Sequence, residues 1–335
     1  MKFGIELPTA TSGMMHPVPF ATPRDLVDLA IEAEQLGYHD AGGNDHLSTM
    51  DFVRRAWPNP PDLYEPLLVL AQVAAKTSVL RLTTGILVLT LRDPVLLAKQ
   101  VATLDQLSGG RVTLGVAVGG YRDEFEAVVP GLRHADRARL TRERIEALRL
   151  LWTERNASYH GEYVHFENVE SFPKPVQAPL PLYSGGNAEG SLRRAASLCD
   201  GWLPAKLSPS GIAAGRAKLA EYARAAGRDP AAITTALQSV VCLGPTREAA
   251  RETFRNSSFD LFRKSLAKTM TKGVDQDAYF DLNLIGTPDE VCAKVEAYAR
   301  AGVEHLTALL FVGNTVEEMR AQIRLFAREV LPSFP

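Results

Sequence analysis

The sequence has few features of a membrane, secreted or nucleic-acid-binding protein. It contains no apolar run of 18 residues, and its three cysteines (Cys199, Cys242 and Cys292) are far apart. Its 37 lysines and arginines nearly balance 39 aspartates and glutamates, for a net charge of -2. Such a balance argues against nucleic-acid and anionic-membrane partners. Isolated cysteines without C-x-x-C spacing are typical of reduced thiols. We therefore expect a cytoplasmic protein without a signal peptide or a transmembrane helix.

Several common catalytic motifs are also missing. The absence of H-x-H and H-E-x-x-H spacings removes the usual metal-hydrolase arrangements. The absence of G-x-S-x-G and of a P-loop removes the commonest serine-hydrolase and nucleotide-hydrolase sites. We expect no metal site, and we interpret the histidines other than His46 as structural; these are His16, His39, His134, His160, His165 and His305.

Strand-like and helix-like patterns alternate along the 335 residues. Amphipathic stretches with helix-start signals, such as Thr22-Pro23 and the capping box from Thr287 to Glu290, separate the strands. Eight alternations favour an α/β fold, a (β/α)8 TIM barrel, over an open doubly wound sheet. The predicted strands are 3–7, 38–44, 81–88, 112–118, 180–184, 201–204, 234–243 and 305–312.

We expect a single domain over residues 1–335, because no repeat, low-complexity tract or linker composition divides the chain. Two regions exceed an ordinary loop and are predicted insertions, around 156–179 and 246–285. The first has polar and aromatic residues that suit a hairpin, and the second is partly helical.

The segment from 82 to 126 is the most informative part of the chain. It reads as a strand, a helix started by Asp93 and Pro94, and a near-continuous apolar strand at 112–118. Asp is a common N-cap, and Pro suits the first helical position. A strand that is apolar on both faces indicates a parallel sheet. In such a sheet the chemistry lies at the carboxyl ends of the strands.

Asp45 and His46 follow the second predicted strand and should stand at this carboxyl end. A histidine there can act as acid, base or hydrogen-bond donor near neutral pH, with Asp45 orienting it or capping the loop. The alternative is a loop histidine bonded to a backbone carbonyl. Position alone does not separate these two interpretations.

A second candidate is Ser184-Gly185-Gly186-Asn187, between the fifth predicted strand and a helix. Glycines with free N–H groups at a helix start form an anion nest, which favours phosphate. The alternative is a tight strand-to-helix turn without a ligand.

A third candidate lies at the exit of the fourth predicted strand. Gly119 and Gly120 leave room for a flat ring near the backbone, and the charged residues 122–124 suit a polar substrate. Spacing alone favours a solvated helix start for 122–124. Lys206, just after the sixth predicted strand, suits a Schiff base, but we interpret it as a surface lysine.

The segment from 82 to 126 resembles the bacterial luciferase-like superfamily of flavin- and deazaflavin-dependent barrels. Similar motifs follow in family order along the rest of the chain, including the acid-histidine pair Asp45-His46. The sequence HGEYVHFENV and the run from Arg193 to Ala196 resemble the actinobacterial branch assigned to coenzyme F420. The matching motifs in the segment are Thr84-Gly85, Arg92-Asp93-Pro94, Leu104-Asp105, Ser108-Gly109-Gly110-Arg111, Leu114-Gly115-Val116, and Gly120 through Glu124.

The resemblance implies a cofactor at the barrel mouth, coenzyme F420 (a deazaflavin) or alternatively FMN. Its phosphate would lie on residues 184–187. Its ring would lie beside Gly119 and Gly120 and against Thr84, Gly85 and Ile86. The family often has a non-prolyl cis peptide at this last position. His46, with Asp45, would lie near the reactive edge of the ring as proton donor or substrate anchor. The cofactor carries the hydride chemistry, and the barrel positions it.

The chain departs from one branch of the family. Sugar-phosphate dehydrogenases of the deazaflavin group have a catalytic glutamate where this chain has Gly120, and a tryptophan near the histidine that is absent after His46. We therefore argue against that activity.

The expected function is transfer of a hydride between F420 and a small organic substrate. The alternatives are an FMN-dependent monooxygenase that uses reduced flavin and oxygen, and a non-catalytic flavin- or deazaflavin-binding protein. Loops at 9–21 and 49–62 and the second insertion should form the substrate pocket. Phe20, Phe52, Trp57 and Tyr64 suggest an apolar or aromatic substrate, and family analogy suggests a homodimer.

Overall fold

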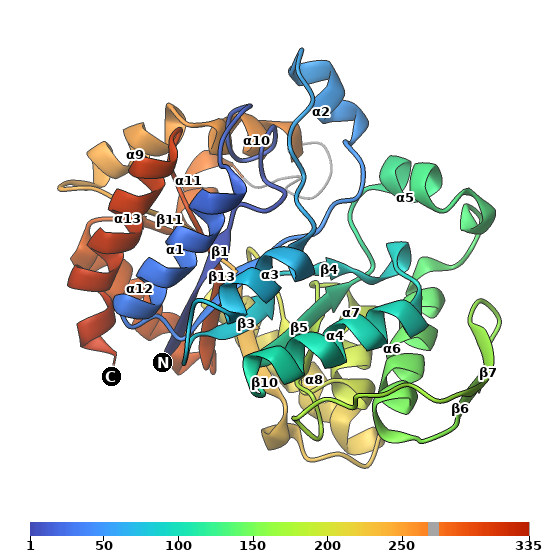
Figure 1. Cartoon of the computed structure of the whole chain (residues 1–335). Coiled ribbons are helices and arrows are strands. Elements are labelled where there is room, and N and C mark those ends of the chain that lie inside the picture. The colour runs from blue at the N-terminus through green and yellow to red at the C-terminus, as the bar shows by residue number, and fades with distance from the viewer. Residues whose placement is uncertain (267–274, 335) are drawn as a thin grey trace.

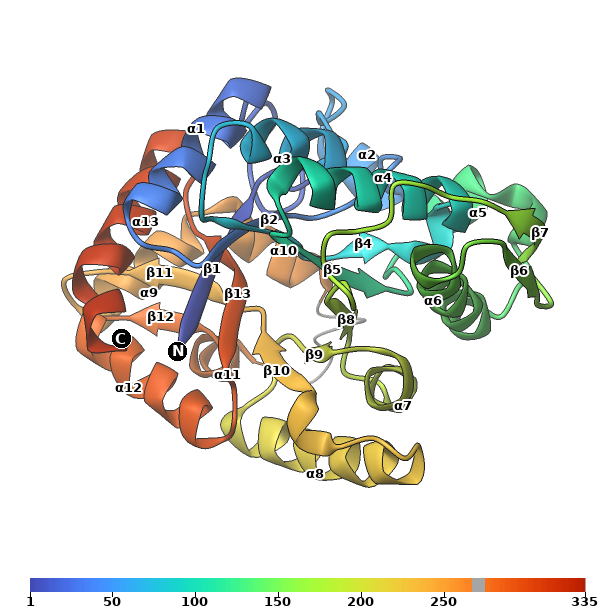
Figure 2. The same cartoon turned by 60° about the horizontal axis from the view of Figure 1, so that its bottom comes forward.

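The protein is a parallel β-barrel surrounded by helices, in a computed structural model that describes residues 1–266 and 275–334 (Figure 1). The barrel strands follow the order β1-β2-β3-β5-β8-β9-β10-β13, and β1 pairs with β13 to close the barrel. Figure 2 shows the helices around the strands. The predicted (β/α)8 TIM-barrel fold is confirmed.

The strands and helices have the following bounds, given in chain order. The strands are β1 (Lys2–Leu7), β2 (Asp40–Gly43), β3 (Arg81–Thr84), β4 (Leu87–Val88), β5 (Val112–Ala117), β6 (Ala157–His160), β7 (His165–Val169), β8 (Leu182–Gly185), β9 (Gly201–Leu203), β10 (Thr234–Leu237), β11 (Val240–Leu243), β12 (Leu284–Gly286) and β13 (His305–Phe311). The helices are α1 (Pro23–Gln35), α2 (Asp51–Ala56), α3 (Pro66–Ala74), α4 (Pro94–Ser108), α5 (Arg122–Val128), α6 (Arg137–Thr153), α7 (Glu189–Leu198), α8 (Pro209–Ala225), α9 (Arg247–Arg255), α10 (Ser258–Leu266), α11 (Gln276–Asp281), α12 (Pro288–Arg300) and α13 (Val316–Glu329).

Two predicted strands are interrupted. The strand predicted at 81–88 divides into β3 and β4, and the strand predicted at 234–243 divides into β10 and β11. Leu82 pairs with Val112 and Leu87 with Val116, so five steps along β3 and β4 match four along β5. One extra residue of this kind bends a strand and redirects its side chains, often beside an active site.

The two insertions differ in structure. The first contains an antiparallel hairpin of β6 and β7, as its composition suggested. The second contains α9, α10, α11 and the unpredicted strand β12, which pairs with β11. Residues 267–274 of the second insertion lie outside the described residues. None of the described helices is long and apolar enough to cross a membrane.

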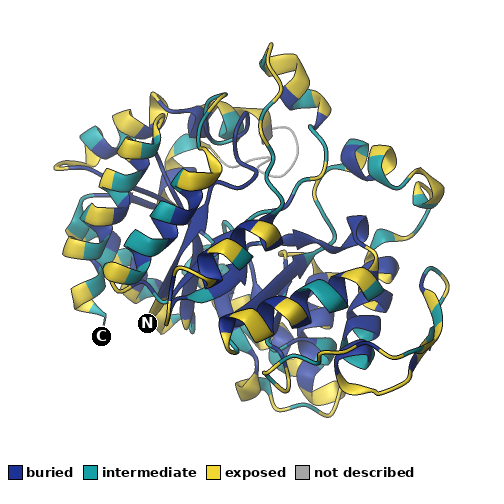
Figure 3. Ribbon diagram, in the orientation of Figure 1, coloured by how far each residue is buried: buried dark blue, intermediate teal, exposed yellow. Residues whose placement is uncertain are grey.

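The residues predicted to start helices do cap them. The side chain of Thr22 caps α1 in a capping box with Asp25, Asp93 caps α4, and Thr287 and Glu290 form the capping box of α12. Each such cap satisfies backbone N–H groups that have no partner within the helix. The apolar faces of these helices pack on the barrel, where burial of apolar side chains stabilises the fold (Figure 3).

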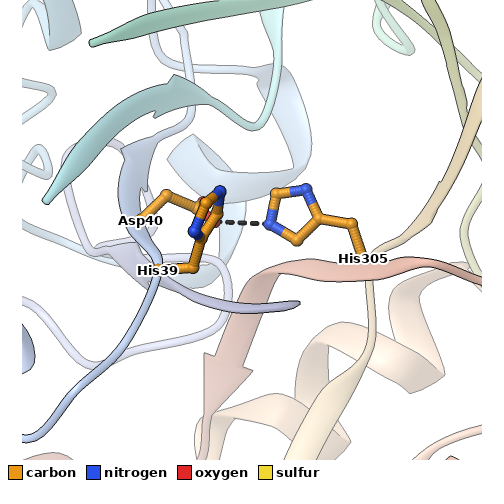
Figure 4. Close-up of side chains that lie close together, drawn as sticks. All are labelled: His39, Asp40 and His305. Atoms are coloured by element: carbon orange, nitrogen blue, oxygen red, sulfur yellow. Dashed lines mark hydrogen bonds and ion pairs between the residues drawn. The ribbon is translucent and has the colours of Figure 1, made fainter. Parts of the chain in front are cut away.

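The base of the barrel contains a buried ion pair (Figure 4). Asp40 at the start of β2 accepts hydrogen bonds from His305 (2.5 Å) and Thr307 (2.6 Å), while His39 lies beside it. Burial alone would raise the pKa of Asp40, but the charge and hydrogen bond of His305 outweigh it and lower that pKa. Gly4 is required opposite, because an added Cβ would lie 2.1 Å from the Asp40 carboxylate.

The fold thus brings together histidines that the sequence places far apart. His39 and His305 lie on either side of Asp40, and His160 lies beside His165 and Glu167 on the hairpin. No metal-like spacing in the sequence predicted these two clusters. We interpret the buried cluster as structural, because both Asp40 oxygens already accept hydrogen bonds. Burial, and then the charges of His305 and nearby cations, lower the pKa of His39 to about 4.

A buried histidine above the barrel predicts how stability depends on pH. His16 stacks on Phe20 with ring centroids 4.0 Å apart, and burial lowers its pKa to about 3. The unfolded chain therefore binds a proton below pH 6.5 that the native protein does not bind, so stability falls as the pH falls. The expected slope is about 1.4 kcal/mol per pH unit. His16→Phe should remove this slope, which urea unfolding at several pH values measures.

The comparison should begin just below pH 6.5 and use the difference in stability between wild type and His16→Phe at each pH, because the contributions of Glu6 and His39 are common to both proteins and cancel. His134→Phe, at an exposed position, controls for loss of a histidine. Parallel pH profiles for wild type and His16→Phe would contradict this prediction.

Candidate active site at the carboxyl end of the barrel

Two adjoining cavities open at the carboxyl ends of the strands. We call the first, of about 210 Å³, the histidine cavity because it contains His46. We call the second, of about 590 Å³, the glycine cavity because five glycines line it, together with residues that neighbour them near the ends of β5 and β8. The walls common to both are Ile86, Gly119, Gly120, Ala205 and Gln238.

The wall between the two cavities contains the cis peptide Gly85-Ile86, the position that the family resemblance singles out. Gln238 Nε2 donates to Gly85 O at 3.3 Å and so connects this wall to the break between β10 and β11. A Cβ added at Gly185 would lie 3.1 Å from Ile86. Small residues therefore keep space open on both sides of the peptide.

His46 is held by Glu124. The two groups meet at 2.9 Å between His46 Nδ1 and Glu124 Oε2, and Glu124 Oε1 accepts from the N–H groups of Leu47 (2.8 Å) and Ser48 (3.3 Å). Because Nδ1 is engaged, Nε2 is the ring nitrogen that remains for a ligand. Glu124 is buried, so the interpretation of 122–124 as a solvated helix start is wrong for this residue.

Asp45 does not orient His46. Its carboxylate accepts from Arg92 through Nε (2.9 Å) and Nη2 (2.6 Å) and from the N–H of Val88 (2.9 Å). A two-point contact with a guanidinium is strong and directional. Arg92 also contacts Glu65 at 2.7 Å. Asp45 thus joins the loop after β2 to β4 and to Arg92, while Glu124 takes the orienting position that the sequence suggested for Asp45.

A buried acid, Glu6, lies at the floor of the histidine cavity. The residue is 1% exposed, and neither carboxyl oxygen has a hydrogen-bond partner among the described residues. A Cβ added at Gly85 would lie 2.7 Å from Glu6 Oε2. Burial, and then the charge of Asp40, raise the pKa of Glu6 well above its ordinary value. This environment favours the protonated acid, which can donate a hydrogen bond or a proton.

The glycine cavity contains a buried guanidinium. Arg194 on α7 donates from Nη2 to Ser191 Oγ (3.0 Å), and its Nε has no partner among the described residues. Burial lowers the pKa of Arg194. α7 begins beside Gly186 without a side-chain cap, which leaves N–H groups for an anion. These donors suit a phosphate.

The predicted cofactor residues divide into two groups. Gly85, Ile86, Gly119, Gly120, Gly185, Gly186 and Asn187 line the cavities. Thr84 and Ser184 lie behind the walls, because their hydroxyls already donate to Gly115 O and Ser191 O. Asn187 follows β8, and both polar atoms of its side-chain amide bond to the backbone of Ala205, which follows β9. These two bonds join the ends of the two strands.

The apolar wall of the histidine cavity comes in part from two expected segments, the loop at 9–21 and the second insertion, but not from the expected aromatic residues. Tyr121, Phe259, Phe262 and Tyr279 line it, together with Met15, Val240 and Leu310. Of the expected aromatics, Phe52 stacks on Tyr121 and so packs behind this wall. The other three pack elsewhere: Phe20 stacks on His16, Trp57 Nε1 donates to Gly13 O, and the Tyr64 hydroxyl donates to Ala21 O. Lys206, interpreted from the sequence as a surface residue, lines this cavity instead.

Sequence reasoning missed the roles of Glu6, Arg92, Arg194 and Gln238. The role of Glu124 could have been predicted, because this residue is the acid of the G-x-x-x-E motif and follows a glycine pair at a strand exit. Arg194 follows the Gly-Gly turn by two helical turns, which is a weaker signal. Glu6 gives only one sign, a charged residue inside an otherwise apolar strand.

Comparisons with known proteins agree with this geometry. Residues 1–305 match the family described as luciferase-like monooxygenase. The chain is 28% identical over 264 residues to an FMNH(2)-dependent dimethylsulfone monooxygenase of Pseudomonas putida, across 72% of this chain and 70% of that protein. The monooxygenase RslO1 from Streptomyces bottropensis has a similar fold, with a TM-score of 0.79, 24% identity and 100% of both chains covered.

A coenzyme F420-dependent tetrahydromethanopterin reductase from Methanopyrus kandleri also has this fold, with a TM-score of 0.76 and 23% identity over 100% of this chain and 99% of that one. At such identities the structural matches show a shared fold. The sequence match to the family covers most of the chain. The chain therefore belongs to the luciferase-like monooxygenase family and is an oxidoreductase of that family.

Proposed function

We propose that the protein binds coenzyme F420 in the two adjoining cavities and transfers a hydride between this deazaflavin and a small organic substrate. The observation that carries the proposal is Arg194, a buried guanidinium that makes no salt bridge with any described residue. An unpaired buried charge is costly, and an anionic ligand offsets that cost. The phosphate of a flavin-like cofactor is such an anion.

The other walls fit a flat ring. The Gly85-Ile86 peptide lies where the two cavities meet. The positive φ of Gly119 (88°) and of Gly186 (112°) would strain a residue with a side chain. A Cβ at Gly119 would also lie 2.6 Å from Val88. These glycines keep the path between the phosphate site and His46 open.

The chain's own residues then have separate tasks. When bound, the reduced cofactor supplies the hydride in the deazaflavin case, or electrons for oxygen activation in the FMN case. His46, oriented by Glu124, presents Nε2 to the substrate, and Glu6 holds a proton at its carboxyl group on the cavity floor. The aromatic wall excludes water from the space between them.

A second candidate function, an FMN-dependent monooxygenase, is favoured by the match to the Pseudomonas enzyme, whose name specifies FMNH(2). One feature supports F420 over FMN. Arg137, at the start of α6, lies at the rim of the glycine cavity and donates to Gly119 O at 3.4 Å. A cation at this rim suits the carboxylates of the F420 tail, which FMN lacks.

Titration of the purified protein with F420 and with FMN, oxidised and reduced, tests the proposal. Tryptophan quenching and the cofactor spectrum report binding. We expect F420 to bind more tightly than FMN, and Arg137→Met to weaken F420 binding several-fold while leaving FMN binding unchanged. FMN binding without F420 binding would contradict the first function and favour the second.

Turnover with a substrate panel completes this experiment. His46→Asn should retain cofactor binding and lower the rate of cofactor oxidation by about 10²- to 10⁴-fold, the usual contribution of an acid-base group. Normal turnover in this variant would remove His46 from the mechanism. Cofactor binding without turnover on any substrate would favour a binding protein.

A further inference from the structure

Lys206 is the most unusual side chain in the histidine cavity. It follows β9 and lines the same cavity as His46. Its Nζ lies 5.8 Å from the centre of the Phe262 ring. Its φ of 57° is left-handed, a conformation that costs a non-glycine residue roughly 1–2 kcal/mol. Unfavourable backbone geometry of this kind is concentrated at ligand-binding sites.

The ammonium group of Lys206 has no opposite charge nearby. No carboxylate among the described residues forms a salt bridge with it, and burial lowers its pKa without a compensating charge. The acids of the same cavity are otherwise engaged: Asp45 is bonded to Arg92, and the environment of Glu6 favours its protonated form. The cavity therefore has a cation without a protein partner.

The surroundings of Lys206 are apolar. Phe259, Phe262 and Tyr279 come from the second insertion, and Val240 and Leu310 come from the barrel. A ligand in this space contacts mainly rings and aliphatic chains, and Lys206 is the cation among its polar neighbours, which include His46 and Gln238. Desolvation makes the attraction between that ammonium and an anion stronger than at a water-exposed surface.

We propose that Lys206 binds the anionic group of the organic substrate, which is therefore a small apolar or aromatic compound with a carboxylate or sulfonate. This inference rests on the proposed function, because it assigns the substrate class of the same site. The phosphate-binding Arg194 lines the glycine cavity instead, so the two cations have separate anions.

Calorimetric titration of the full chain with matched probes tests this assignment without turnover. The probes are benzoate against benzyl alcohol, and hexanoate against hexanol. We expect wild type to bind each anion at least about tenfold more tightly than its neutral partner. Lys206→Met should abolish that preference, and Lys206→Arg should retain most of it. Lys218→Met, on the exposed face of α8, should behave as wild type.

The cofactor titration is run on the same variants and should give unchanged cofactor affinity. The proposal is overturned if wild type shows no preference for either anion, or if Lys206→Met keeps the preference. It is also overturned if Lys206→Met loses cofactor affinity, because Lys206 would then belong to the cofactor site. If no cofactor binds but the anion preference depends on Lys206, the proposed function fails and the anion site stands.

Discussion

Glu6→Gln is expected to stabilise the protein at neutral and alkaline pH while lowering turnover by about 10²- to 10⁴-fold. An amide occupies the same space as the buried acid but cannot transfer a proton. Cofactor affinity should remain near the wild-type value, because the change lies on the cavity floor and leaves the glycine cavity unaltered. Urea unfolding and a single-turnover assay measure the two effects on the same preparation.

The sign of the stability change follows from the pKa of Glu6. An unfolded glutamate loses its proton near pH 4.5, whereas the raised pKa keeps the proton on folded Glu6 to higher pH. The native protein therefore binds more protons than the unfolded chain above pH 4.5, and its stability falls as the pH rises. Glutamine does not titrate, so the advantage of Glu6→Gln should grow by up to about 1.4 kcal/mol per pH unit.

Glu143→Gln is the matched control, because Glu143 is also buried but well bonded. Its carboxylate accepts from the N–H groups of Glu162, Tyr163 and Val164. Burial alone would raise the pKa of Glu143, but these bonds outweigh it and lower that pKa. The same substitution should therefore destabilise the protein at neutral pH without changing turnover. Equal effects of the two substitutions would contradict the role of Glu6.

Arg194→Met is expected to weaken binding of the cofactor by about 100-fold or more. A charge-assisted contact with phosphate is among the stronger hydrogen bonds in proteins, and a loss of about 2.8 kcal/mol corresponds to this factor. The variant should fold at least as stably as wild type, since it removes a buried guanidinium without a charged partner. Titration of each variant with the cofactor measures the loss.

Arg193→Met supplies the control one residue away. Arg193 is exposed and pairs with Glu189 on the outer face of α7, so its loss should leave cofactor affinity unchanged. Phosphate-free analogues, the deazaflavin chromophore without its tail and riboflavin, separate the phosphate from the ring. They should bind wild type and Arg194→Met equally. A loss of affinity for these analogues as large as for the intact cofactor would place Arg194 against the ring.

Much of the fold follows from local sequence signals. The cap at Asp93, the capping box at Thr287 and Glu290, and the apolar strand at 112–118 act within a few residues, so a single sequence reveals them. The breaks between β3 and β4 and between β10 and β11 were not predictable from local pattern. The runs at 81–88 and 234–243 are each rich in β-branched and apolar residues, so each is predicted as one strand. The breaks arise from pairing with strands that are distant in sequence.

The site follows less completely. His46 was predicted from its position after a strand, but its partner Glu124 lies 78 residues away. Asp45 similarly meets Arg92 across 47 residues. Adjacent residues in sequence were assigned to each other, whereas the barrel pairs each with a residue that follows another strand, Arg92 after β4 and Glu124 after β5. Which acid contacts which base is decided by tertiary packing, so residue type and spacing identify candidates but not their pairing.

Asp40 acts on the site from the base of the barrel, whereas the substrate walls lie at the strand exits. Its charge helps to keep Glu6 protonated, and it is held by His305 and Thr307 at the base of the barrel. The walls that would contact a substrate come instead from the exits of β2, β5 and β9 and from the insertion at 246–285. Exchange of these loops, by natural drift or by grafting, would leave the charge of Asp40 in place and would act on the pKa of Glu6 only through its burial, the larger cause of the shift. A barrel of this kind can acquire new substrate walls while it keeps the charge that favours protonated Glu6.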